Sequence, residues 1–326
     1  MENLSRAEAK NLCGEFIAKK HSDQDISQIL VELAAKGETA DEIAGFSDSL
    51  LQHAEPFPNR KAAMDVCGTG GSSVERFNVS TATAFILASL GVNIAKHGNC
   101  GSTRPNGSFD LLEELGIPID LDGSALSACL EETGLAFIYA RKFHPAMKEV
   151  AAARKLAGRR SIFNLAGPLS NPANITKQVI GTVDEKLMQI LRDTAKAIGR
   201  EACLVVTGFP GIDELSVAGP SKILHDHRIQ QEVRPEELGA ETCDYNQIPC
   251  GNAPENAREF LKLIDGSGQK NLEDIVCVNT GLALYCEGKV DEIKRGTEEA
   301  RNAIRGGTVK NKFLEYKKMA EKFSRR

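Results

Sequence analysis

Residues 62–91 read AAMDVCGTGGSSVERFNVSTATAFILASLG, in which a short apolar run, a glycine turn and an apolar helix follow one another directly. The run at 62–67 has the length and composition of a buried strand, and the helix expected at 82–90 ends at Gly91. A strand, a tight turn and a helix in this order form the first part of a βαβ unit, whose next strand runs parallel to the first.

Four more short apolar runs follow, at residues 92–96, 135–140, 178–183 and 202–207, with helical patterns between them. Strands separated by helices predict a parallel sheet, because right-handed crossovers place the helices on its faces. We therefore expect an α/β fold, mainly a parallel sheet with helices on both faces. In such a sheet the functional crevice lies beyond the carboxyl ends of the strands.

The first 55 residues predict three helices instead of strands. Ser5 with Glu8, and Thr39 with Glu42, have the spacing of a capping box ahead of apolar residues at helical intervals. A helix between them begins near Ser22 and stops at a glycine, and the sequence Pro-Phe-Pro at 56–58 closes the region. This pattern indicates a small helical domain ahead of the sheet.

The composition is that of an ordinary globular protein, with 326 residues, 41% hydrophobic and 26% charged. The length favours two domains, or one large domain with an insertion. No apolar stretch approaches the roughly 18 residues of a membrane span and no signal-peptide pattern is present, so we expect a cytosolic protein. Nine scattered cysteines without a CxxC pair predict neither a disulfide framework nor a zinc site.

The net charge of −5 argues against a general nucleic-acid binder. Positive charge gathers only at 310–326, where seven Lys or Arg face two Glu. We interpret this segment as an amphipathic helix with Phe313, Tyr316, Ala320 and Phe323 on its buried face and lysines in solvent.

Two polar segments follow the first two predicted strands. Glycines at 68–71, followed by Asn-Val-Ser-Thr at 78–81 opening a helix, suit a phosphate, because backbone amides and a helix start face an anion. A glycine turn made only for packing fits this segment equally well. The second segment is Lys-His-Gly-Asn at 96–99, and its polar loop, which contains Arg104, leads to a helix near Ser108. In the alternative, Lys96 and His97 pair with surface acids.

Two further segments carry charge that fits a site. Asp213 and Glu214 lie in a glycine-bounded loop and offer the hard oxygen ligands that Mg²⁺ prefers, although acidic pairs are also common on surfaces. Arg154 follows His144 and Pro145, which we expect to open a helix carrying Arg154 about three turns along; its guanidinium either receives a carboxylate or lies in solvent. The His-Asp-His run at 225–227 lacks a third metal ligand, so we disfavour a metal there.

Taken together and in this order, the segments resemble the anthranilate phosphoribosyltransferase family. The similarity runs nearly end to end, through NLSRAEA, KGETADEIAG, DVCGTGG, FNVSTATAF, AKHGN, NGSFDLLEELG, HPAMKEVAAARKLAGRRSIFNLAGPLSNPA and GIDELSVAG. It implies a helical domain at 1–60, with a contribution from about 145–172, and an α/β domain from 61–144 and 173–326. It also implies phosphoribosyl transfer to anthranilate in tryptophan biosynthesis, magnesium, and a homodimer formed through the helical part.

The resemblance assigns roles residue by residue. The contacts to phosphoribosyl pyrophosphate would be Gly68, Gly71, Asn78, Ser80, Thr81, Lys96 and Ser108. Magnesium would be held by Ser80, Asp213 and Glu214, and anthranilate by Gly68, Asn99 and Arg154. Lys96 and Arg154 would be the catalytic residues, since Lys96 stabilises the leaving diphosphate and Arg154 positions the acceptor.

This sequence departs from the family at four positions around the expected site. Ser72 replaces the acid usual after GTGG, Arg76 a small hydroxyl residue, Cys100 an arginine, and Arg104 a loop serine. We hypothesise that Arg76 or Arg104 reaches the phosphates and takes over part of the charge neutralisation that an acid-held second magnesium would supply.

Three alternatives stay open at this point. One is a paralogue with another aromatic acceptor, and a second is a non-catalytic relative that binds nucleic acid through its basic C-terminal segment. The third is a pyrimidine nucleoside phosphorylase, against which Asn99 and Arg154 speak because they occupy the aromatic-acid positions. We expect no membrane partner, and we consider nucleic acid a poor match to the acidic total.

Overall fold

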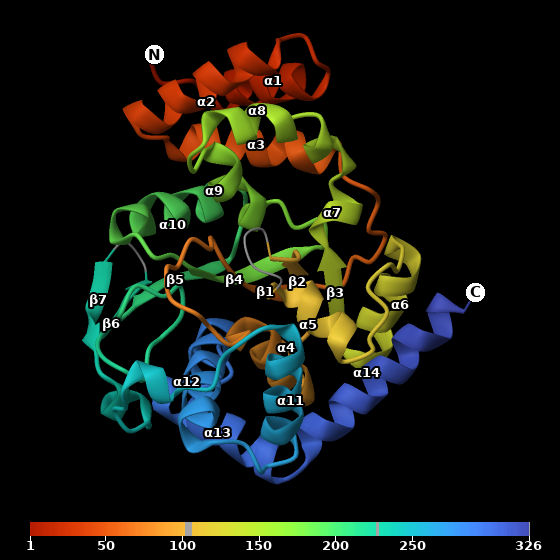
Figure 1. Cartoon of the computed structure of the whole chain (residues 1–326), viewed down its shortest axis with the longest axis vertical. Coiled ribbons are helices and arrows are strands. Elements are labelled where there is room, and N and C mark those ends of the chain that lie inside the picture. The colour runs from red at the N-terminus through yellow and green to blue at the C-terminus, as the bar shows by residue number, and fades with distance from the viewer. Residues whose placement is uncertain (102–105, 226–227, 326) are drawn as a thin grey trace.

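The computed structural model describes residues 1–101, 106–225 and 228–325. Arg104 and the Asp-His pair at 226–227 therefore lie outside the described residues. Three helices form the N-terminal bundle at the top of Figure 1: α1 (Arg6–Ile17), α2 (Asp23–Lys36) and α3 (Ala40–Gln52). Both predicted capping boxes are confirmed, and Ser22 caps α2.

A seven-stranded sheet forms the centre of the molecule, in the order β3-β2-β1-β4-β5-β6-β7. The strands are β1 (Ala63–Gly68), β2 (Ile94–Gly98), β3 (Leu135–Tyr139), β4 (Ile175–Gly181), β5 (Ala202–Gly208), β6 (Ser221–His225) and β7 (Arg228–Val233). The first five are parallel, which confirms the α/β prediction and all five predicted strands. The antiparallel pair β6–β7 was not predicted; a short connection without a helix returns the chain beside β5 in the opposite direction.

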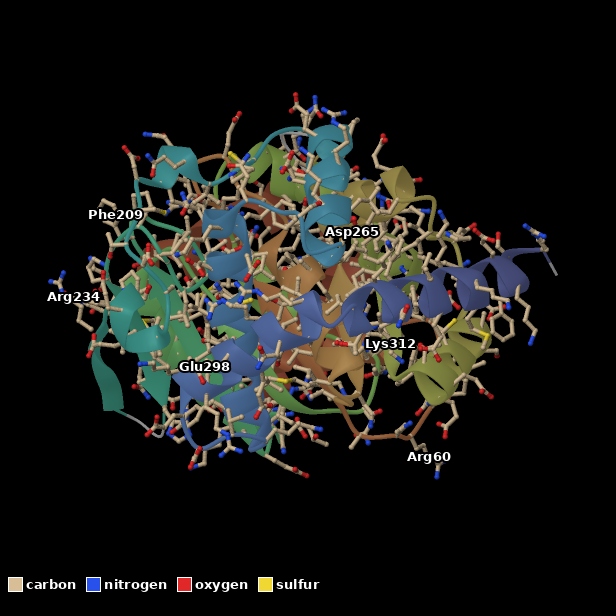
Figure 2. The ribbon with its side chains drawn as sticks, turned by 90° about the horizontal axis from the view of Figure 1, so that it is seen from below. Arg60, Phe209, Arg234, Asp265, Glu298 and Lys312 are labelled. Carbon is tan, nitrogen blue, oxygen red and sulfur yellow. The ribbon has the colours of Figure 1, made fainter. Side chains whose placement is uncertain are left out.

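The lower face of the sheet carries α4 (Val79–Ser89) and α12 (Lys270–Glu287), with three more helices around them (Figure 1). These are α11 (Ala253–Ile264), α13 (Ile293–Arg305) and α14 (Thr308–Ser324), seen from below in Figure 2. The fully buried ring of Phe85 on α4 contacts aromatic rings from β3, α11 and α14. The predicted amphipathic C-terminal helix is confirmed as α14.

Two helices cover the edge of the sheet near β3, α5 (Ser108–Glu114) and α6 (Gly123–Thr133), and α6 packs on β3 and α14. The upper face carries α9 (Ile162–Leu169) and α10 (Met188–Ala197), on both of which α3 packs. Along β4 and β5, Val179 and Leu204 face the lower core whereas Ile180 and Val205 join the core of the bundle. The bundle and the sheet therefore share one continuous apolar contact.

The segment after β3 differs from the expectation. It begins with α7 (Ala140–Phe143), and a 3₁₀ turn at Pro145–Lys148 precedes a separate helix, α8 (Ala151–Ala157), that packs on α2. The expected single helix from Pro145 to Arg154 is wrong, because fully buried Val150 takes a non-helical conformation between the two pieces. No described helix is both long and apolar enough to span a bilayer.

Candidate active site

The glycine turn after β1 is joined to the loop that follows β5. The Gly70 N–H donates to Asp213 Oδ2 (3.0 Å), across 143 residues of sequence. Gly70 and Gly71 have φ angles of 69° and 90°, a region that residues with side chains rarely adopt. A Cβ atom at Gly68 would overlap the Asp213 carboxylate, so glycine is required there for the loop to approach. Ser72 Oγ adds a hydrogen bond to the carbonyl of Gly211 (3.0 Å).

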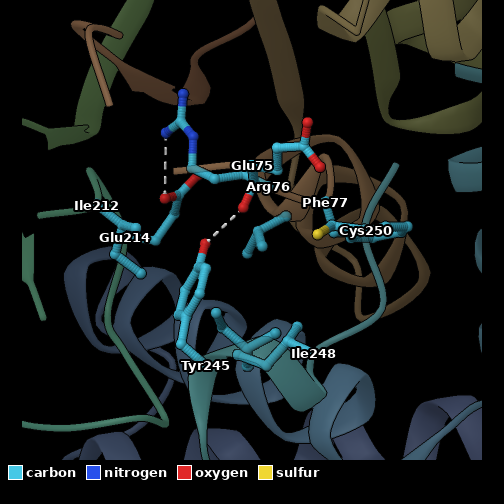
Figure 3. A pocket seen from close by; sticks show the side chains of 10 residues that line it. Glu75, Arg76, Phe77, Ile212, Glu214, Tyr245, Ile248 and Cys250 are labelled. Atoms are coloured by element: carbon cyan, nitrogen blue, oxygen red, sulfur yellow. Dashed lines mark hydrogen bonds and ion pairs between the residues drawn. The ribbon is translucent and has the colours of Figure 1, made fainter. Parts of the chain in front are cut away.

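The carboxylates of Asp213 and Glu214 meet a cation from the same turn. Arg76 Nη1 contacts Asp213 Oδ1. It also lies 3.4 Å from Glu214 Oε2, as Figure 3 shows. Only 4% of the Asp213 side chain and 13% of the Glu214 side chain are exposed, so the group is largely withdrawn from water. Burial raises the pKa of Glu214, and the charge of Arg76 opposes that shift. The structure therefore places Arg76 on the acidic pair.

Three asparagines hold the backbone around Arg76. The Arg76 carbonyl accepts from Asn106 Nδ2 (3.0 Å) and from Asn256 Nδ2 (3.3 Å), and Asn256 also reaches Asn78 Oδ1 (3.0 Å). Asn78 begins α4 but makes no side-chain cap, because its Oδ1 accepts from Asn256 instead. Its Nδ2 donates to the Asn106 carbonyl (3.1 Å). Asn256 lies on α11, is fully buried, and was missed from the sequence: nothing in its own neighbourhood marks it, since its partners lie 150 or more residues away.

Lys96 lies at the carboxyl end of β2 with only 2% of its surface exposed. Its Nζ donates to the Val66 carbonyl on β1 (2.8 Å). Burial lowers the pKa of Lys96, and the charge of Asp65 opposes that shift. Asp65, which sequence analysis also missed, is fully buried and accepts from Asn171 Nδ2 (3.0 Å). The ammonium group is thus held inside the sheet edge beside the glycine turn.

The described residues at the two ends of the loop between β2 and α5 bind the same carboxylate. The two described glycines of this loop, Gly101 and Gly107, both donate backbone N–H bonds to Asp110 Oδ2 (2.7 and 2.6 Å). A Cβ atom at Gly98 would lie 3.3 Å from that of Ser108, so the start of α5 sits directly on the end of β2. Asn99 Oδ1 accepts from the Cys100 N–H (2.9 Å). Asn99 and Ser108 therefore lie together at this strand end.

Ser80 and Thr81 lie in the first turn of α4. Thr81 is fully buried, and its hydroxyl has no hydrogen-bond partner among the described residues, whereas Ser80 is half-buried. The structure therefore gathers the glycine turn, the start of α4 and the acidic pair at one edge of the sheet. The small pocket next to Arg76, lined also by Glu75 and Tyr245, holds only about 10 Å³, too little for a substrate (Figure 3).

Arg154 is not in this group. It lies on α8, where its guanidinium carbon is 5.6 Å from the centre of the Phe163 ring. Burial lowers its pKa, and no ion pair or hydrogen bond joins its side chain to another described residue. An unpaired, partly buried guanidinium can bind an anion. No described contact connects Arg154 with the acidic pair.

The fold, with a glycine turn and a buried acidic pair at the edge of a parallel sheet beside a helical bundle, is that of the glycosyl transferase class. The model of the glycosyl transferase family a/b domain matches residues 60–310, and that of the family's helical bundle domain matches 1–54. Anthranilate phosphoribosyltransferases from Petrotoga mobilis and Natronomonas pharaonis are 40% and 38% identical to this chain. They match over 96% and 94% of it and over 92% and 93% of their own lengths.

Solved structures agree with these matches. The anthranilate phosphoribosyltransferase of Thermus thermophilus has a TM-score of 0.93 and 32% identity, with 98% of this chain and 97% of that one covered. The yeast enzyme solved with PRPP and Mg shares the fold at a TM-score of 0.87 and 23% identity, with 98% of this chain and 94% of that one covered. The chain belongs to the anthranilate phosphoribosyltransferase family, whose members transfer a pentosyl group.

Proposed function

We propose that this protein transfers the phosphoribosyl group of phosphoribosyl pyrophosphate to the amine of anthranilate and releases pyrophosphate, a step of tryptophan biosynthesis. The observation that carries the proposal is the bond between the Gly70 amide and Asp213, which joins an anion-binding turn to a buried carboxylate pair. Family membership over nearly the full length supports the same reaction.

The donor lies, in this proposal, at the glycine turn. Gly68 and Gly71 let backbone amides approach its phosphates, and the contacts continue through Asn78, Ser80, Thr81 and Ser108. As the bond from the anomeric carbon to the pyrophosphate oxygen breaks, positive charge develops on the ribose and negative charge on the leaving group. Lys96 stabilises the leaving group from its buried position, where little solvent screens its charge.

Magnesium fits the chemistry of the donor set. Ser80, Asp213 and Glu214 offer hydroxyl and carboxylate oxygens, the ligands that this ion prefers. When bound, the ion supplies charge neutralisation for the diphosphate. Asp213 is held in place by the Gly70 amide, so one of its oxygens keeps a fixed orientation.

The acceptor is held by its carboxylate. Gly68 and Asn99 lie at the strand ends, and Arg154, which has no described ion pair, receives the acid group. The aromatic amine of anthranilate is neutral at pH 7, so its lone pair attacks the anomeric carbon without a strong base. Arg154 therefore acts by positioning the acceptor.

We also propose that the protein forms a homodimer through its helical part and that it is located in the cytoplasm. A changed aromatic acceptor is the second candidate, favoured by Cys100, whose Sγ lies 3.3 Å from Tyr139 Oη beside the acceptor residue Asn99. A nucleic-acid-binding role would rest on the basic residues of α14 alone.

The test is the loss of anthranilate fluorescence on mixing the protein with phosphoribosyl pyrophosphate and magnesium, run beside a panel of other aromatic amine acids. We expect turnover with anthranilate above all other acceptors. Turnover of another amine in its place would establish the changed acceptor. Absence of any turnover, together with tight DNA binding that weakens steeply with salt, would refute the transferase proposal.

A further inference from the structure

The acidic pair already has a cation that belongs to the chain. The Arg76 guanidinium contacts Asp213 and lies 3.4 Å from Glu214, the two carboxylates proposed above for magnesium. Two adjacent carboxylates with little exposed surface repel each other strongly unless a positive charge lies between them. Among the described residues, Arg76 is the cation that meets both.

The position of Arg76 is fixed from its backbone outward. Its carbonyl accepts hydrogen bonds from Asn106 and Asn256, and the Tyr245 hydroxyl donates to the carbonyl of the preceding residue, Glu75 (3.0 Å). Three segments distant in sequence thus hold the backbone from which the side chain reaches the acids. Figure 3 shows one of these contacts, between Tyr245 and Glu75. Only a quarter of the Arg76 side chain is exposed.

The Asp213 carboxylate is equally constrained. Asp213 Oδ2 accepts from the Gly70 amide, and the closeness of Gly68 and Gly181 to Asp213 leaves no space for a Cβ atom at either position. Asp213 cannot turn away from the guanidinium without breaking its hydrogen bond to the glycine turn. A divalent ion that uses the same oxygens therefore has to displace the guanidinium.

We propose that Arg76 is a tethered cation that occupies the acidic pair in the substrate-free protein and excludes divalent ions from it. This rests on the proposed function only in taking Asp213 and Glu214 as the metal ligands. It differs from the hypothesis that Arg76 or Arg104 reaches the phosphates, since the described contact of the Arg76 guanidinium is with the acids and Arg104 lies outside the described residues. Metal binding at the pair is then coupled to the departure of Arg76.

The experiment is direct binding of Mn²⁺ to the substrate-free protein, measured from the electron paramagnetic resonance signal of the free aqua ion. We expect Arg76→Ser to bind Mn²⁺ about tenfold or more tightly than the unaltered protein, because removing the guanidinium leaves two buried carboxylates unpaired. Glu214→Gln in the Arg76→Ser background should abolish the gain. This measurement needs no substrate and no turnover.

Arg234→Ser is the matched control, since it removes the same charge from an exposed side chain at the edge of the molecule (Figure 2). It should leave Mn²⁺ affinity within about twofold. Arg76→Gln, which keeps a larger polar side chain without the charge, replaces the serine variant if thermal melting shows that the latter is unfolded. Equal Mn²⁺ affinity in the unaltered protein and the folded Arg76 variant would overturn the proposal. The fluorescence assay separately decides the transferase function.

Discussion

Among single residues, Arg154 is the one whose chemistry depends on a ligand. Its guanidinium is partly buried over Phe163 and pairs with no described acid. A carboxylate that docks there gains a charge-assisted contact in a poorly hydrated setting. We therefore predict that this side chain binds the acceptor, although it lies apart from the residues proposed for the donor.

Arg154→Ala should lower kcat/KM for anthranilate by about 100-fold, because the acceptor loses its orientation, with KM for phosphoribosyl pyrophosphate changed little. Steady-state kinetics with each substrate varied in turn measures both. Arg159→Ala, at an exposed arginine five residues on, is the matched control and should keep near-normal values. A variant that loses donor affinity and acceptor affinity alike would contradict the assignment.

Asn256 is the residue that the structure adds to the site. Its amide donates to the Arg76 carbonyl, Asn78 and Asn106, so it links α11 to both loops of the proposed donor site. Asn256→Ala should reduce the free energy of unfolding by about 2–3 kcal/mol, since buried partners lose a donor. Urea unfolding gives this value.

Asn246→Ala removes an exposed asparagine side chain from the nearby 3₁₀ turn at Tyr245–Gln247 and should cost less than about 0.5 kcal/mol. If the two variants unfold at the same urea concentration, the Asn256 network contributes nothing to stability.

At the scale of elements, a histidine pair joins β2 to the segment after α7. The rings of His97 and His144 are both buried and lie 5.1 Å apart, edge to face. Burial lowers the pKa of each below 6.5, and the neighbouring imidazole lowers that of His97 further. Both rings are therefore neutral in the folded protein at neutral pH.

This pair should weaken the fold in mild acid. Above pH 6.5 the rings are neutral in both folded and unfolded states, so they add no pH dependence. As the pH falls below 6.5, the two histidines become protonated in the unfolded chain but stay neutral in the folded protein. The free energy of unfolding therefore falls by up to about 1.4 kcal/mol per pH unit for each histidine. Burial raises the pKa values of Asp65 and Glu214, so these two acids change the free energy of unfolding in the opposite direction as the pH falls.

Urea unfolding between pH 5 and 7.5 measures the slope, and a comparison with His144→Gln isolates the pair from the acids. In this variant the free energy of unfolding should fall less steeply with decreasing pH below pH 6.5. His53→Gln, which removes an exposed imidazole, is the control. An unchanged slope in His144→Gln would show that the pair does not govern the acid response.

At the scale of the whole molecule, the bundle and the sheet form one packed body in which α3 lies on α9 and α10. The upper face of the sheet is covered from two parts of the chain, because α8 and α9 return to the first three helices. Arg154 belongs to this upper layer and the acidic pair to the sheet edge. The residues proposed for the acceptor and for the donor thus come from different layers.

Light scattering should give a mass of twice 35.2 kDa if the proposed dimer forms. Leu156, 59% exposed on α8, lies in the helical layer, so Leu156→Glu should reduce the mass toward one chain by burying a charge in the interface. Leu314→Glu, at a leucine 52% exposed on α14, is the matched control and should stay dimeric. A single-chain mass for the unaltered protein would refute the dimer.

Sequence patterns predicted the five parallel strands, the capped helices and the glycine turn. Each of these depends on residues close together in the chain, such as Ser5 with Glu8 or the apolar run before Gly68. The break between Pro145 and α8 was not predicted, because it depends on Val150, which is fully buried in a non-helical conformation. That burial is an effect of tertiary packing. The β6–β7 hairpin was not predicted either, because β6 is also stabilised by pairing with β5, an earlier segment of the chain.

The sequence by itself determined the class of fold and the family, because alternation of strands and helices and a string of spaced motifs are local properties. Only the tertiary structure decided that Arg76 lies on Asp213 and Glu214, 138 residues from the latter, and that Asn256 holds the same turn from 180 residues away. Side chains so distant in sequence meet only when the sheet and its helices are packed. Burial then makes an unpaired charge or polar group costly, so each one is stabilised by the partner that packing brings beside it.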